Sequence, residues 1–187
     1  MKIFYYIGLF ITLTTLSSCE ENDYVQPAEL PAPTQEGKQT FGAEINGIKW
    51  TPFQRFQSNS NYHVPEAIWG KYTAQTLRIA VNNQETLESL SFMVNSVKGE
   101  GTYRFMTYFP KQGSNIQFSP YASVYQKCKS GNCEQYVIHP SFENSITITH
   151  FDSLQKIYSG KFTVSFINKN NPNDIVTLRD GRFDIKE

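Results

Sequence analysis

The residues best suited to covalent chemistry are the three cysteines. Cys19 follows a Leu-Ser-Ser run at 16–18, and this run is preceded by Lys2 and an apolar stretch over 3–16. A leucine and two small residues before a cysteine are typical of the site where a bacterial signal peptide is cut and the thiol receives a diacylglycerol. The apolar run is shorter than the ~20 residues that a membrane-spanning helix needs. The pattern predicts a signal peptide over 1–18 and lipidation of Cys19.

The other two cysteines, Cys128 and Cys133, are separated by Lys-Ser-Gly-Asn. An exported chain meets an oxidising compartment, where two such close cysteines usually pair. The Ser-Gly-Asn run is typical of a turn, so we expect a disulfide that closes the end of a hairpin. The alternative is a metal site with His139, which would need at least one more ligand at a suitable spacing. We expect no metal and no cofactor.

Catalytic motifs are absent from the sequence. The three histidines (His63, His139 and His150) are scattered, and none has a neighbouring nucleophile that would form a catalytic pair. The chain has no Gly-x-Ser-x-Gly, no His-Glu-x-x-His and no phosphate-binding glycine loop. The Asn-rich run over 168–174 could be read as a calcium loop, but only Asp174 brings a carboxylate, and a hairpin turn is the simpler interpretation. We expect no enzyme, although groups assembled only in space would escape this search.

Aromatic side chains are the best candidates for ligand recognition. Five of them lie in or near expected loops, where tyrosine and tryptophan rings could form a platform for a glycan or a peptide. Most aromatic rings in β domains belong to the core instead, so this interpretation competes with simple packing. The five candidates are Tyr62, Trp69, Tyr72, Tyr108 and Tyr121.

Charge excludes one class of partner. The chain carries 17 Lys and Arg against 17 Asp and Glu. Removing residues 1–18 takes away Lys2 alone, which leaves 16 against 17. A chain so close to neutral has no electrostatic reason to bind nucleic acid or an anionic membrane surface. We expect a monomer that contacts the membrane through its lipid.

The folded part is expected to be a single β domain over 40–187, joined to the lipid by a tether over 19–39. The tether contains three prolines and could reach roughly 60 Å from the membrane if it were fully extended. Apolar and polar residues alternate in short runs, and Asn46-Gly47 is the strongest hairpin signal. A short helix could start at Asn83, but the apolar alternation that follows favours a second hairpin turn over Asn83-Gln-Glu-Thr86. Asp180-Gly181 suggests a β-bulge. About ten short strands predict an antiparallel β-sandwich or a partly closed barrel.

The entry over 30–50 contains Thr-Phe-Gly and Asn-Gly-Ile-Lys-Trp, and the end of the chain contains three strand-like stretches over 145–152, 157–166 and 176–184, the last with Asp-Gly-Arg-Phe-Asp at 180–184. These four stretches resemble a lipoprotein family of Bacteroidota that is known only as a domain of unknown function. The resemblance implies an antiparallel β domain on a lipid anchor, and it carries over no catalytic residues.

The functional prediction is a lipid-anchored, non-catalytic binding or accessory module of the cell envelope. We expect it at the outer membrane, and the acidic residues after Cys19 resemble a signal for display on the cell surface. A calycin-like barrel that binds a small hydrophobic ligand is one alternative, and it would require an enclosed apolar cavity. An envelope hydrolase is the other, and it would require a carboxylate pair or a histidine cluster in a cleft.

Overall fold

A computed structural model describes five segments of the chain, namely residues 25–27, 29–54, 67–105, 123–139 and 141–187. In these segments eleven strands form a single antiparallel sheet. No helix within the described segments has the length and apolar character needed to cross a membrane. The strands are β1 (Thr40–Ile45), β2 (Ile48–Trp50), β3 (Ile68–Thr73), β4 (Thr76–Asn83), β5 (Glu88–Val94), β6 (Gly101–Arg104), β7 (Val124–Lys129), β8 (Asn132–Ile138), β9 (Ser145–Asp152), β10 (Ile157–Asn168) and β11 (Ile175–Lys186).

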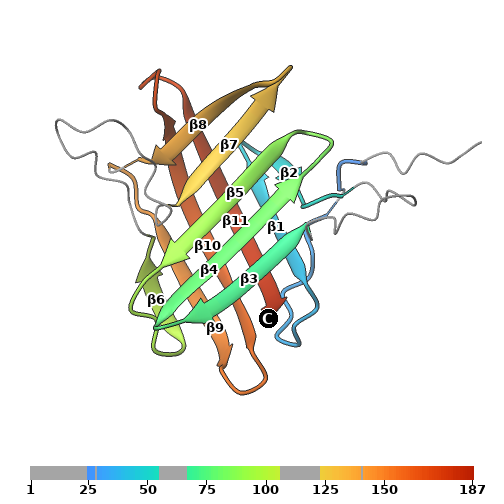
Figure 1. Ribbon diagram of the computed structural model, residues 1–187, viewed down its shortest axis with the longest axis vertical. Coiled ribbons are helices and arrows are strands. Elements are labelled where there is room, and N and C mark those ends of the chain that lie inside the picture. Colours follow the sequence, from blue (N-terminus) through green and yellow to red (C-terminus); the bar gives the residue numbers. More distant parts are fainter. Residues whose placement is uncertain (1–24, 28, 55–66, 106–122, 140) are drawn as a thin grey trace, which may run out of the picture.

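The sheet bends into two layers. Its strand order is β2-β1-β11-β10-β8-β7-β5-β4-β3, with β9 and β6 branching from β10. Strands β3, β4 and β5 lie in front of β1, β11 and β10, and β7 and β8 connect the two layers at one side (Figure 1). Strands β2 and β3 end the path without pairing with each other, so the sheet is not closed into a barrel. The predicted all-β antiparallel fold is confirmed.

Aromatic rings fill the space between the layers. The ring of Phe92 on β5 lies 4.8 Å from that of Phe162 on β10 and 6.0 Å from that of Phe41 on β1. Phe105 packs against the same group, 4.8 Å from Phe92. All four rings are buried, and this apolar burial is the main favourable term in folding.

Local turn chemistry explains the hairpins. Asn46 and Gly47 both have positive φ, which the two-residue turn between β1 and β2 requires and which these residue types tolerate. Asn83 closes the β4–β5 turn, because its Oδ1 accepts hydrogen bonds from the backbone amides of Glu85 and Thr86. A β-bulge interrupts β11 at the predicted position, Asp180-Gly181, because the register of β11 with both neighbours shifts there. These three predictions are confirmed.

Part of the expected tether belongs to the folded domain. The carboxylate of Asp184 on β11, which is only 1% exposed, accepts five hydrogen bonds, four of them from the N-terminal segment. The backbone carbonyl of Pro31 also accepts a hydrogen bond from Arg182. The chain is therefore fixed to the sheet well before residue 40, and the extended reach predicted for 19–39 is too long. The five donors are the hydroxyls of Thr34 and Ser159 and the backbone amides of Glu36, Gly37 and Lys38.

Candidate functional sites

The predicted site residues fall into two groups. Cys19, Tyr62, Tyr108 and Tyr121 lie outside the described residues. Cys128 and Cys133 face each other on β7 and β8 and form the predicted disulfide, with their Cα atoms 4.0 Å apart. Because the two sulfurs are bonded to each other, the alternative metal site with His139 is wrong. His139 instead packs against a phenylalanine ring, and its Nδ1 accepts a backbone hydrogen bond.

Trp69 and Tyr72 lie on strand β3 itself, near its two ends, and not in a loop. Strand β3 pairs with β4 through the turn Ala74-Gln75. Both turn residues have positive φ although neither is glycine, asparagine or aspartate, so the usual signal of a tight hairpin is missing from the sequence.

The two aromatic residues point to opposite faces of the sheet. The Tyr72 ring packs 5.5 Å from Tyr158 and 5.0 Å from Phe151, and its hydroxyl donates to the backbone carbonyl of Val97. Tyr72 is therefore part of the core packing and does not fit the predicted ligand platform. Trp69 lies on the outer face and is 43% exposed.

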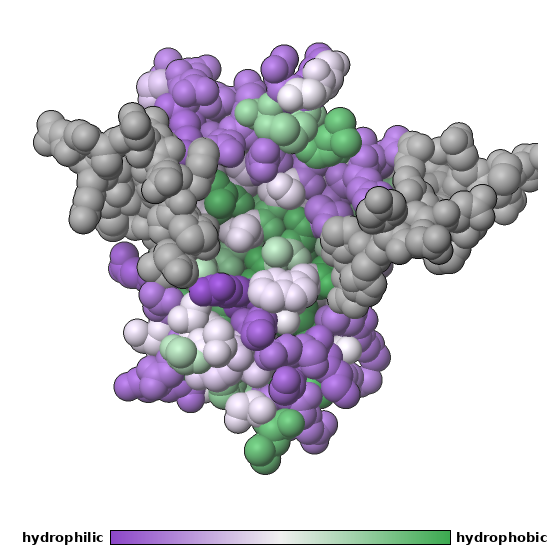
Figure 2. All heavy atoms as spheres, in the orientation of Figure 1, coloured by the Kyte–Doolittle hydropathy of each residue, from purple (hydrophilic) through white to green (hydrophobic). Residues whose placement is uncertain are grey.

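Trp69 borders a shallow hollow of about 310 Å³ on the outer face of β3, β4, β5 and β7. Figure 2 shows apolar side chains gathered in a depression near the middle of this face. We call this surface depression the Trp69 hollow. Its lining comprises Trp69, Ala80, Val81, Asn82, Ser89, Leu90, Ser91, Val124 and Gln126.

Strand register explains how the Trp69 hollow is built. Residues paired across neighbouring strands share a face of the sheet, so two adjacent rows of side chains cross it. The first row is small or apolar and runs Trp69, Ala80, Ser91, Val124 and Val137. The second row carries amides and a hydroxyl and runs Asn82, Ser89, Gln126 and Gln135. None of the residues that line the hollow is charged, although Lys71 and Arg78 pair farther along β3 and β4.

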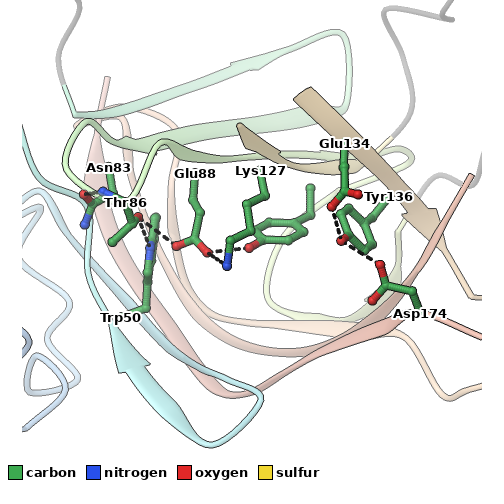
Figure 3. A network of polar contacts seen from close by, with 9 residues as sticks. Trp50, Asn83, Thr86, Glu88, Lys127, Glu134, Tyr136 and Asp174 are labelled. Carbon is green, nitrogen blue, oxygen red and sulfur yellow. Dashed lines mark hydrogen bonds and ion pairs between the residues drawn. The ribbon is translucent and has the colours of Figure 1, made fainter. Parts of the chain in front are cut away.

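A second hollow, the Glu88 cleft, lies at the end of the domain that carries the β1–β2 and β4–β5 turns. Its volume is about 380 Å³. Figure 3 shows the polar contacts along its wall. Its lining comprises Gln26, Ile45, Asn46, Ile48, Lys49, Trp50, Thr86, Glu88, Tyr125, Lys127, Tyr136, Asp174 and Val176.

Glu88 is the central group of this cleft, and it is only 7% exposed. One carboxylate oxygen accepts a 2.6 Å hydrogen bond from the Tyr125 hydroxyl and lies 3.3 Å from the Lys127 ammonium. The other oxygen accepts a 2.8 Å hydrogen bond from Thr86, whose hydroxyl in turn accepts from the Trp50 indole. Alternation along β5 could have indicated this position, because Glu88 is in phase with the buried Leu90 and Phe92.

Two neighbouring tyrosines extend the network. The rings of Tyr125 and Tyr136 lie 5.3 Å apart. The Tyr136 hydroxyl lies 2.9 Å from Asp174 and 3.1 Å from Glu134, so both carboxylates surround it. Burial raises the pKa of Tyr125, and its hydrogen bond to Glu88 raises it further. Burial and the hydrogen bond to Asp174 likewise raise the pKa of Tyr136, so both phenols stay protonated and act as donors.

The chemistry of this cleft is that of a satisfied polar network. The oxygens of Glu88 are occupied by two hydroxyl donors and an ammonium group, and Asp174 also accepts a hydrogen bond from the Asn168 amide that closes the β10–β11 turn. This use of Asp174 fits the hairpin interpretation of 168–174 better than the calcium loop. Within the described segments, no group of three or more His, Cys, Asp or Glu side chains could hold a metal ion.

Comparison with known proteins leaves the chain without an assigned family. No family model matches it, and no curated protein or solved structure gives a significant match. The likeness to Bacteroidota lipoproteins therefore remains a prediction from the sequence.

Proposed function

We propose that the protein is a lipid-anchored, non-catalytic binding module of the bacterial cell envelope, and that it binds a neutral glycan in the Trp69 hollow. The observation that carries this proposal is the half-exposed Trp69 ring beside an uncharged hollow that combines apolar side chains with amides and hydroxyls. The anchor is the lipid expected on Cys19, and the Bacteroidota resemblance agrees with it.

Glycan chemistry matches the composition of the hollow. A sugar ring presents C–H groups on one face, and these pack well against an aromatic ring. Its hydroxyl groups are donors and acceptors at once, and so they suit the amides of Asn82 and Gln126 and the hydroxyls of Ser89 and Ser91. The small side chains of Ala80 and Ser91 leave room beside the indole for a ring to lie flat. A charged ligand would find no opposite charge in the lining.

The packing of the interior favours this surface site over the alternative of an enclosed hydrophobic ligand. The space between the layers is occupied by the rings of Phe41, Phe92, Phe105 and Phe162. The hydrolase alternative receives no comparable support, because the buried Glu88 is already saturated by its own donors.

Affinity electrophoresis tests the glycan proposal. The full mature chain is run in detergent through gels that contain mannan, laminarin or galactomannan, with the anionic polygalacturonate as a chemical control. At least one neutral polysaccharide should retard the wild-type protein, and Trp69→Ala should weaken that binding about tenfold or more. Leu154→Ala is the matched control, because Leu154 is 94% exposed and lies in the distant β9–β10 turn. Equal mobility of wild type and Trp69→Ala in every gel would refute a glycan site at Trp69.

Fractionation tests the anchor. Cys19→Ala should move the protein from the membrane to the soluble fraction, and a Cys19→Ala protein that stayed membrane-bound would contradict lipidation. Protease treatment of intact cells tests surface display. Resistance until the outer membrane is broken would place the domain on the periplasmic side instead.

A further inference from the structure

The N-terminal segment sets how far the domain can lie from its anchor. Residues 30–38 are fixed to β11 and its neighbours, and Gln35 also donates to the carbonyl of Thr149 on β9. The structure describes the chain from Val25. The link from Cys19 to Val25 spans at most about 20 Å when fully extended. The lipid must therefore lie close to whichever part of the domain Val25 approaches.

That part is the end with the Glu88 cleft. Gln26 lines the cleft together with Ile48 and Thr86, so the chain leaves the described domain beside the β1–β2 and β4–β5 turns. The β9–β10 turn lies at the opposite end of the molecule (Figure 1). A bilayer that holds the lipid within about 20 Å of Val25 would therefore face the cleft end.

Three exposed apolar side chains lie at the same end. Val25, Ile48 and Leu87 are 81%, 58% and 50% exposed. Ile48 lines the cleft itself, and Leu87 lies between the cleft residues Thr86 and Glu88. Apolar side chains at the level of the lipid headgroups gain free energy by leaving water. Lysines and carboxylates both occur here, so net charge is not the reason for the contact.

We infer that the domain rests with its cleft end against the bilayer that holds its lipid, and that Ile48 and Leu87 enter the headgroup layer. This inference rests on the proposed lipid anchor at Cys19. It turns the tether from a long spacer into a short link that sets orientation. It also leaves the Trp69 hollow on a side of the domain, beside the membrane and accessible from solvent.

Fluorescence quenching by lipids tests the orientation. The full lipidated chain is placed in phosphatidylcholine vesicles that contain a spin-labelled lipid as the quencher. An environment-sensitive dye is attached to Ile48→Cys or, at the opposite end, to Leu154→Cys. Neither native disulfide cysteine is available to the dye. Leu87→Cys offers a second position at the cleft end, so a failure of Ile48→Cys to fold would still leave the test decisive.

The expected result is loss of most of the fluorescence at position 48 or 87 and little loss at 154. Equal quenching at both ends, or stronger quenching at 154, would overturn the inference. The anchor is checked separately, by flotation of the labelled protein with the vesicles. Protein that fails to float would refute the anchor itself, whereas protein that floats with both ends equally exposed would refute only the orientation.

Discussion

Replacing Asp184 by asparagine tests whether one buried carboxylate joins the N-terminal segment to the sheet. The asparagine would keep the size of the side chain but would present an NH₂ group where the native carboxylate accepts hydrogen bonds. The native oxygens receive 2.7 Å and 2.9 Å bonds from Ser159 and Gly37 and further bonds from the same segment. The substitution therefore leaves buried donors without acceptors.

The pKa of Asp184 gives the size of the effect. Burial by itself would raise this pKa, but the hydrogen bonds from Ser159, Thr34 and the backbone amides of Lys38 and Gly37 outweigh it and lower the pKa from 3.8 to about 2. This difference corresponds to about 2 kcal/mol of native stability. Adding the cost of the unpaired donors, we expect Asp184→Asn to lose about 3 kcal/mol at pH 7.

The sign of the pH dependence follows from the lowered pKa. A carboxyl group whose pKa is depressed in the folded state stabilises the protein above its unfolded pKa, near 4, and this contribution disappears as the pH falls through the folded pKa, near 2. The stability difference between wild type and Asp184→Asn should therefore be constant above about pH 5 and about 2 kcal/mol smaller at pH 2. The other carboxyl groups titrate in both proteins, so their contributions cancel in the stability difference.

Urea unfolding at pH 7 and at pH 2 measures both quantities. Asp180→Asn is the control, because Asp180 lies on the same strand with an exposed side chain, and it should change stability by less than about 0.5 kcal/mol. Tryptic cleavage after Lys38 should also be faster in Asp184→Asn, because the segment is released. The reasoning fails if the two variants unfold at the same urea concentration, or if the difference for Asp184→Asn is the same at both pH values.

Two further predictions concern the packing of the sheet and the cleft. Gly160→Ala would place a Cβ atom 2.3 Å from the backbone oxygen of Thr147, so it should lower the free energy of unfolding by about 3 kcal/mol. A Cβ atom at Gly99 would meet no atom within 4 Å, so Gly99→Ala should hardly change the stability measured by thermal unfolding. Equal melting of the two variants would contradict the close approach of β9 and β10. Glu88→Gln should lower the pKa of Tyr125 towards its ordinary value of 10.0, which ultraviolet titration of tyrosinate detects. A raised phenol pKa contributes its full stability below about pH 10, and this contribution is lost progressively as the pH rises further. The wild type should therefore lose more stability than Glu88→Gln at high pH. Identical alkaline curves would show that the contact is not formed.

Features that depend on a few consecutive residues could be read from the sequence. Asn46-Gly47 predicts its hairpin because these two residue types accept positive φ at little cost. Cys128 and Cys133 predict their disulfide because a short turn brings them opposite each other. The alternation of apolar residues gives the all-β fold for the same reason, since neighbouring side chains on a strand point to opposite faces.

Features that depend on register between distant strands could not be read in this way. Trp69 and Gln126 line one hollow because β3, β4, β5 and β7 pair in a particular register, which no local pattern specifies. Strand β3 itself carries no clear local signal, because its turn, Ala74-Gln75, lacks the residues that normally mark positive φ.

The sequence by itself determined the expected anchor, the disulfide and the class of fold, because each depends on residues that are adjacent or nearly adjacent in the chain. The tertiary structure alone decided that residues 30–38 belong to the domain, because the donors of this segment lie about 150 positions away from Asp184, which accepts their hydrogen bonds. It likewise decided that the buried Glu88 is balanced by Tyr125 and Lys127, which pairing of β5 with β7 brings beside it. Contacts between distant residues exist only once the chain has folded, and burial then makes them strong.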